Sequence, residues 1–213
     1  LPSDANAKII CRALKKYKNA YTRYFNLNNR RNAYTKIMRD VLPRVVLIPG
    51  HGLIGVGKTA KIAAKVADLA ETWVEVVTAA ESIGRFFPAS SKDIFDIEYW
   101  TPETAKLKTG PALPLEGQVA LVTGGGSGIG AATAQAFSEA GAEIVVLDFN
   151  VKAAESVAHG LGGLGLGSDV TDPKSVRRAF KQAVSSYGGL DIVVSNAGAA
   201  WHGEIGTVSD SIL

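Results

Sequence analysis

The feature that most constrains the fold is a regular alternation of apolar stretches and helical patterns in the second half of the chain. Apolar stretches predict strands at residues 119–124, 143–148, 164–169 and 190–198. Between them, helical spacing and capping residues predict helices at residues 127–141, 151–160 and 172–188. Strands that alternate with helices form a parallel sheet with helices on both faces. The sequence therefore predicts an α/β fold whose second half is a doubly wound parallel sheet of four strands.

A glycine-rich loop, Thr123-Gly124-Gly125-Gly126-Ser127-Gly128-Ile129-Gly130, joins the first of these strands to the first helix. In this context one glycine makes the tight turn and the next lets the backbone approach a pyrophosphate. Gly130 then allows the helix to pack closely on the strand, while the N–H groups at the helix start favour an anion. The loop therefore predicts a dinucleotide site of the Rossmann type.

Asp148 ends the second predicted strand, 18 residues after Gly130. At this place a carboxylate accepts hydrogen bonds from both ribose hydroxyls of the adenosine half of the dinucleotide. The same charge would repel a 2′-phosphate, and no lysine or arginine occurs in the glycine loop or at Phe149 and Asn150 to offset it. We therefore expect NAD as the cofactor rather than NADP.

The glycine loop, Asp148, Asp169-Val170 and the stretch Ser195–Gly198 occur in an order that resembles the N-terminal half of the short-chain dehydrogenase/reductase family, over residues 115–205. Ser195 stands where the family commonly has asparagine. The resemblance implies that the pyrophosphate side is contacted by Gly124, Ser127, Gly128, Ile129 and Gly130. It also implies that the adenine is contacted by Asp169 and Val170, and that the nicotinamide ribose is approached by Asn196, Ala197 and Gly198.

The catalytic pair of that family has the spacing Tyr-x-x-x-Lys, which does not occur in these 213 residues. In the family the tyrosine is the general acid/base and the lysine lowers its pKa. We therefore assign no catalytic residue and expect a fragment that binds NAD without turnover; whether it acts as an enzyme is left open. Its fourth strand is expected to be exposed, which favours edge-to-edge association, so a homo-oligomer also stays open.

The stretch "RVVLIPGHGLIGVGKTAKIAAK", residues 44–65, offers an alternative function. Gly52, Gly57, Lys58 and Thr59 have the spacing of a P-loop, in which backbone N–H groups and the lysine surround phosphates. Such a site also needs a surrounding parallel sheet and a strand that ends in a magnesium-binding aspartate, and residues 45–110 offer one strand and one long helix. We therefore favour a strand-to-helix turn, with Lys58 solvated or bound to an acidic group, and keep ATP or GTP binding through Gly52–Thr59 as the alternative.

The first half contains "PRVVLIPGHGLIGVGKTAKIAAKVADLAE", "AAESIGRFF" and "FDIEYW", followed by a proline-rich stretch and "GQVALVTG". This order resembles the middle of bacterial fusion proteins that join a class II, rhamnulose-1-phosphate-type aldolase to a short-chain dehydrogenase. The resemblance implies a parent that cleaves a deoxyketose phosphate and oxidises the small hydroxyaldehyde produced. It places the zinc-binding histidines of the aldolase upstream, and His51, His159 and His202 are too far apart to suggest a metal site.

The two resemblances together give the expected domains. Residues 1–110 form a mostly helical linker region, and residues 114–213 form the N-terminal half of the NAD-binding domain. Within the linker region, periodicity predicts helices at residues 7–25 and 62–83 and a strand at 45–48. Residues 86–100 are expected to be irregular, and Thr101-Pro102-Glu103 has the pattern of a helix start.

Charge is distributed unevenly along the chain. Residues 1–44 carry 11 Lys+Arg against 2 Asp+Glu, whereas residues 115–213 carry 5 against 10. Because no nucleic-acid-binding motif accompanies the basic helix, a solvated face or an acidic neighbour is favoured, and we expect a small-molecule substrate rather than a nucleic acid as partner. The sequence contains one cysteine, and it has no apolar run that could span a bilayer or serve in a leader. Both features favour a cytoplasmic protein without a membrane partner.

Overall fold

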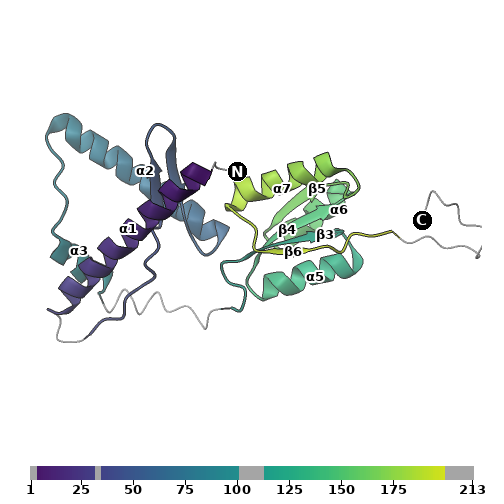
Figure 1. Ribbon diagram of the computed structural model, residues 1–213, viewed down its shortest axis with the longest axis horizontal. Helices are drawn as coiled ribbons and strands as arrows, with labels where there is room; N and C mark the ends of the chain where they lie inside the picture. Colours follow the sequence, from purple (N-terminus) through teal and green to yellow (C-terminus); the bar gives the residue numbers. More distant parts are fainter. Residues whose placement is uncertain (1–3, 32–34, 101–112, 200–213) are drawn as a thin grey trace, which may run out of the picture. The chain divides into compact units, whose positions relative to one another are not determined.

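The computed structural model describes residues 4–31, 35–100 and 113–199 (Figure 1). The chain divides into two compact units. Unit 1 comprises Leu1–Gly57 and Lys61–Pro111, and unit 2 comprises Lys58–Ala60 and Ala112–Leu213. Among the described helices, none combines the length and apolarity that a bilayer crossing requires. The predicted helix start at Thr101 lies outside the described residues.

Unit 2 is a four-stranded parallel sheet with helices on both faces. Its strands are β3 (Val119–Thr123), β4 (Glu143–Asp148), β5 (Leu164–Gly167) and β6 (Ile192–Val194), in the spatial order β5-β4-β3-β6. Its helices are α5 (Gly128–Glu139), α6 (Val151–Gly160) and α7 (Pro173–Tyr187). The pairings of β3 with β4 and β6, and of β4 with β5, are all parallel. This arrangement confirms the α/β fold expected from the alternation.

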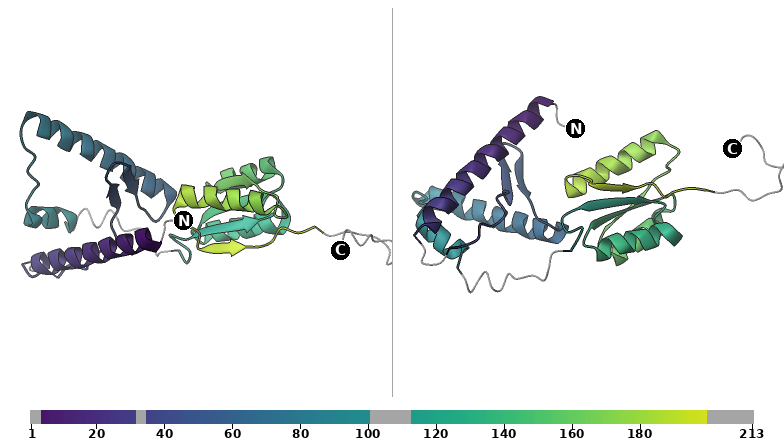
Figure 2. Two further views of the ribbon diagram at one scale, coloured as in Figure 1. Left: turned by 45° about the horizontal axis from the view of Figure 1, so that its top comes forward. Right: turned by 60° about the horizontal axis from the view of Figure 1, so that its bottom comes forward.

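The sheet is buried from both sides because its side chains alternate between two core layers. Ala120 and Val122 pack with Ala134 of α5 and with α6, whereas Leu121 packs with Ala183 of α7. Helices α5 and α6 therefore cover one face of the sheet and α7 covers the other (Figure 2). Alanines on all three helices let each helix approach the strands closely. The core thus explains why β3 and β4 are nearly continuous runs of apolar residues.

The helices of unit 2 begin and end at capping residues that can be recognised in the sequence. Asp172 accepts hydrogen bonds from the N–H groups of Lys174 and Ser175, and Pro173 follows it in the first turn of α7. Gly188 ends the helix in the left-handed region, with φ of 82°. The predicted strand at 143–148 and helix at 151–160 are observed at those bounds, while β5 ends two residues earlier than expected.

Unit 1 consists of α1 (Asp4–Asn29), an antiparallel hairpin of β1 (Val45–Ile48) and β2 (Gly52–Gly55), α2 (Ala60–Ile83) and α3 (Ser91–Glu98). The predicted long helix and the strand at 45–48 are confirmed. The prediction of an irregular segment at 86–100 is wrong, because Ser90 caps a short helix by accepting a hydrogen bond from the Asp93 N–H. Helix α1 also continues beyond its predicted end at Phe25, as far as Asn29.

Helix α3 packs on α1 through an aromatic cluster. Phe25, Phe95 and Tyr99 are buried, and the ring centroids of Phe95 and Tyr99 lie 4.6 Å apart. Beside the cluster, the Tyr24 hydroxyl donates to Glu98 Oε2 at 2.9 Å and the Tyr21 hydroxyl donates to Glu98 Oε1. Desolvation, followed by the hydrogen bonds to Glu98, raises the pKa of both tyrosines above the ordinary value of 10.0.

Replacing Tyr24 with phenylalanine should destabilise unit 1 by about 1 kcal/mol, because one hydrogen bond to a carboxylate near the surface is lost. A group whose pKa is raised by folding stabilises the fold below its unfolded pKa, and this contribution disappears as pH rises through the folded value. The stability difference between wild type and Tyr24→Phe should therefore be constant below about pH 10 and shrink above it.

Thermal unfolding of the full chain between pH 7 and 11, followed together with tyrosinate absorbance, measures this difference. Tyr17→Phe is the matched control, since Tyr17 lies on the same helix and is 43% exposed. Equal stability losses in the two variants, with the same pH dependence, would contradict the role given to Glu98.

Candidate nucleotide-binding site

The glycine loop connects the end of β3 to the start of α5. Gly124 leaves the strand with φ of 63° and Gly128 opens the helix with φ of 53°. Both values lie in the left-handed region, which side chains other than glycine adopt only with strain. Ser127 is the N-cap residue of α5, and its side chain makes no capping hydrogen bond to the helix. The first turn of α5 therefore keeps N–H groups that an anion can accept.

The inner side of the loop is closely packed and its outer side is open. A Cβ atom at Gly130 would lie 2.2 Å from the carbonyl oxygen of Gly124, and one at Gly126 would lie 2.8 Å from Asp148 Oδ2. At Gly128, by contrast, an added Cβ would meet nothing within 4 Å. Glycine thus allows the loop to lie against the sheet, while the backbone at the start of α5 faces free space. This geometry fits a pyrophosphate placed against the helix N-terminus.

Asp148 holds the loop from the neighbouring strand. Its Oδ2 atom accepts a hydrogen bond from the Gly126 N–H at 2.9 Å, and its Oδ1 atom accepts one from the Asn150 N–H at 2.9 Å. Each carboxylate oxygen has a second lone pair for another donor. The carboxylate is therefore fixed beside the glycine turn and retains the capacity to accept two hydroxyl groups.

A third connection reaches the loop from β6, through Thr123. The Thr123 hydroxyl accepts hydrogen bonds from the N–H groups of Asn196 and Ala197, both at 3.0 Å. The Asn196 side chain in turn donates to the carbonyl oxygens of Thr123 and Gly124, at 3.0 and 3.2 Å. Asn196 and Ala197 are thereby held next to Gly124. Thr123 is not among the predicted site residues, although it is the first residue of the glycine-rich loop.

Asp169 and Val170 follow β5 at the same edge of the sheet. Asp169 Oδ1 accepts hydrogen bonds from the Thr171 hydroxyl at 2.7 Å and from the Thr171 N–H at 2.9 Å. The hydrogen bond from the Thr171 hydroxyl has the larger effect, and together the two hydrogen bonds lower the pKa of Asp169 below its ordinary value. Val170 is 46% exposed, and Gly198 is exposed beyond β6. Asp169 is therefore ionised and oriented by its own turn.

All the sequence-predicted site residues lie at the carboxyl edge of one parallel sheet. The chain passes from β3 through β4 to β5 on one side and then returns to place β6 on the other side of β3. The strand order reverses between β3 and β6, and ligands of open α/β sheets bind in the crevice at such a point. The loop from Gly124 to Gly130 follows β3 and so lies at this reversal, with Asp148 and Asn196 on its two sides.

The alternative P-loop is not supported by the structure. Gly52–Gly55 form β2, the second strand of an antiparallel hairpin, so Gly52 is paired with Ile48 and does not begin a phosphate loop. Lys58 Nζ donates to Glu116 Oε2 at 3.1 Å within unit 2, as expected for a lysine bound to an acidic group.

Among the described residues, no group of three or more His, Cys, Asp or Glu side chains could hold a metal ion.

Comparison with known proteins finds a matching family model for each part of the chain. Residues 2–107 match the family described as "Aldolase class II, second domain", and residues 118–212 match "short chain dehydrogenase". The uncharacterized oxidoreductase YuxG of Bacillus subtilis is 32% identical over 202 residues, which cover 91% of this chain and 29% of that protein. D-threitol dehydrogenase of Mycolicibacterium smegmatis is 45% identical over 91 residues, 40% of this chain and 35% of that protein. The chain thus spans about a third of the length of these relatives.

Among solved structures, 3-ketoacyl-(acyl-carrier-protein) reductase from Brucella melitensis, complexed with NADH, is 37% identical with a TM-score of 0.45. The alignment covers 46% of this chain and 41% of that protein. The two family matches and YuxG together span both units. Residues 118–212 therefore match the short-chain dehydrogenase family and follow a match to an aldolase class II second domain, which is consistent with an aldolase–dehydrogenase fusion.

Proposed function

We propose that unit 2 binds NAD and forms the cofactor half of an oxidoreductase that acts on a small hydroxyaldehyde or alcohol. The observation that carries this proposal is the Asp148 carboxylate, which is fixed beside the glycine turn by the Gly126 N–H at 2.9 Å. A pyrophosphate on the open side of Gly128 would place the adenosine ribose toward β4, where Asp148 ends the strand. Short-chain dehydrogenases use a nicotinamide dinucleotide, which donates or accepts a hydride.

Each predicted site residue has a part in this proposal. The backbone of Gly124, Ser127, Gly128, Ile129 and Gly130 receives the pyrophosphate through N–H groups and the dipole of α5. Asp169 and Val170 border the adenine, where Val170 offers an exposed apolar side chain. Asn196, Ala197 and Gly198 approach the nicotinamide ribose from β6. The Asn196 amide already donates to two loop carbonyls, so its part is to hold the loop as much as to contact the cofactor.

The choice of NAD follows from charge. Asp148 ends β4, where the 2′-hydroxyl of the adenosine would lie, and a 2′-phosphate there would meet a like charge. The glycine loop and the two residues after Asp148 contain no lysine or arginine. The Asp148 oxygens therefore favour two ribose hydroxyls over a phosphate.

The domain organisation supports a wider activity. We propose that residues 1–110 belong to an aldolase part and residues 114–213 to the dehydrogenase part of a bifunctional protein. The aldolase would release a small hydroxyaldehyde from a sugar phosphate, and the dehydrogenase would oxidise it. Unit 2 binds and orients the cofactor in this scheme, and no proton-transfer role is assigned to a residue of this chain.

Replacing Asp148 with asparagine should weaken NAD binding about tenfold and reduce the preference for NAD over NADP. Asparagine keeps an oxygen for the Gly126 N–H but removes the charge, and a hydrogen bond to a charged group is worth about 1.5–3 kcal/mol. Calorimetric titration of the full chain with NAD and NADP measures both constants. Glu155→Gln, a charge-removing change at an exposed acid of α6, is the control and should alter neither constant. A preference that stays the same in Asp148→Asn would disprove the assignment.

Replacing Thr123 with valine should lower the stability of unit 2 by about 1–3 kcal/mol, because two backbone N–H groups lose their acceptor. NAD binding should weaken as well, since the loop loses its connection to Asn196 and Ala197. Thr123→Ser keeps the hydroxyl and should restore both properties. Urea unfolding and NAD titration of the three proteins test this; Thr123→Val and Thr123→Ser behaving alike would show that packing of the methyl group matters instead.

A further inference from the structure

A groove of about 380 Å³ lies on unit 1, between the end of α1 and the start of α3. Residues of α1, Arg31 in the turn that follows it, and Ser91 at the start of α3 line this groove. It therefore has two walls from different elements. We propose that this groove binds the phosphate group of a small phosphate monoester, a site distinct from the dinucleotide site of unit 2.

Two arginines, Arg23 and Arg31, line the groove. Arg23 and Leu27 lie about one turn apart on α1, and Arg31 follows in the turn after the helix. Both arginines line the same groove as Leu27. A planar guanidinium group can donate two parallel hydrogen bonds to the oxygens of a phosphate.

Neither arginine is neutralised within the described residues. The ion pairs found there join Arg44 to Asp40 and Lys58 to Glu116, and neither involves Arg23 or Arg31. Of the three acids of the neighbouring helix α3, Asp96 helps to raise the pKa of Tyr24, and the other two already have donors of their own. Asp93 accepts from the Ser90 hydroxyl at 2.7 Å, and Glu98 accepts from Tyr21 and Tyr24. None of these three acids lines the groove, and the charged side chains that do line it are Arg23 and Arg31.

The remaining lining suits the carbon part and the ester oxygens of a small ligand. Leu27 is 54% exposed and, with Ala20, forms an apolar floor. Tyr24 donates its hydroxyl proton to Glu98, so it presents its ring to the groove rather than a donor. Ser91, on the opposite wall, adds a hydroxyl group. Two cations, one hydroxyl and an apolar floor define a site for a phosphorylated small molecule.

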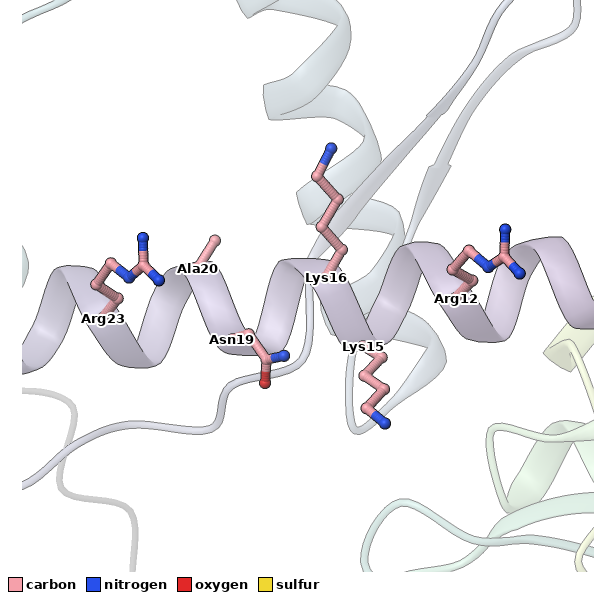
Figure 3. Close-up of a pocket in the computed structure, with 6 residues that line it drawn as sticks. All are labelled: Arg12, Lys15, Lys16, Asn19, Ala20 and Arg23. Atoms are coloured by element: carbon pink, nitrogen blue, oxygen red, sulfur yellow. The ribbon is translucent and has the colours of Figure 1, made fainter.

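The rest of the basic surface of α1 attracts anions but does not build such a site. In Figure 3 the side chains of Lys15 and Lys16 extend from opposite sides of the helix, and those of Arg12 and Arg23 lie over the ribbon in this view. All the residues of that shallow hollow come from α1, so it has no second wall. Clustered cations raise the local concentration of anionic ligands. This surface would therefore speed the approach of a phosphate to the groove, and it supplies matched control residues.

Titration of the full chain with inorganic phosphate, by calorimetry at low salt, tests the proposal. Saturable binding is expected in wild type, and Arg23→Gln or Arg31→Gln should each weaken it about tenfold. Arg12→Gln and Lys15→Gln remove the same charge outside the groove and should change the affinity less than twofold. Glycerol phosphate should bind more tightly than inorganic phosphate, because its carbon chain can cover Leu27. NAD titration of every variant provides an independent reading of unit 2 and should stay at the wild-type value.

Three results would overturn the proposal. The first is the absence of saturable phosphate binding in wild type. The second is equal weakening in all four variants, which would mean diffuse attraction to the helix. The third is binding of a single-stranded oligonucleotide or of phosphatidic acid vesicles far more tightly than glycerol phosphate, which would assign the surface to a polyanion or a membrane. Helical circular dichroism of Arg23→Gln and Arg31→Gln must match wild type, and loss of phosphate binding with intact NAD binding separates this site from the dinucleotide site.

Discussion

The hydroxyl group of Thr123 holds together the three segments on which the site of unit 2 depends. It ends β3, accepts two N–H groups from the segment after β6, and lies next to the glycine that starts the loop. These segments are more than 70 residues apart in the chain, so local preference cannot bring them together. The hydrogen bonds of Thr123 fix where β6 leaves the sheet, and the Asn196 amide then fixes the carbonyls of the glycine loop. Asp148 completes the arrangement from the opposite side.

The sequence predicts unit 2 well because each element there satisfies local and global requirements at once. Glu143–Asp148 has only apolar residues between its ends because it is buried on both faces, and Pro173 and Gly188 mark the two ends of α7. The glycine loop could be assigned for a related reason, since its backbone conformation excludes other residues. The part of Thr123 could not be read from its spacing, because its partners are defined only when β3 and β6 pair.

Unit 1 is less predictable because long-range aromatic packing decides its structure. Residues 86–100 have few features of a strong helix, and α3 forms where Phe95 and Tyr99 can be buried against Phe25 of α1. The P-loop pattern, kept only as the alternative, has a different explanation. Gly52 and Gly57 match a spacing that is common in turns, and what distinguishes the two cases is the partner of the strand, which is antiparallel here.

The two units offer anions two different physical solutions. In unit 2 the ligand would contact backbone N–H groups, the N-terminus of a helix and an aspartate, and no lysine or arginine of the glycine loop. Its affinity would therefore come from the fixed geometry of the backbone. In unit 1 the charge resides on long, exposed side chains, and attraction between exposed charges is screened within a few ångströms at high salt. Raising the salt concentration should therefore weaken phosphate binding in unit 1 much more than NAD binding in unit 2. The difference arises because glycines and buried hydrogen bonds hold the loop of unit 2 in one backbone conformation, whereas the groove of unit 1 relies on the charge of Arg23 and Arg31.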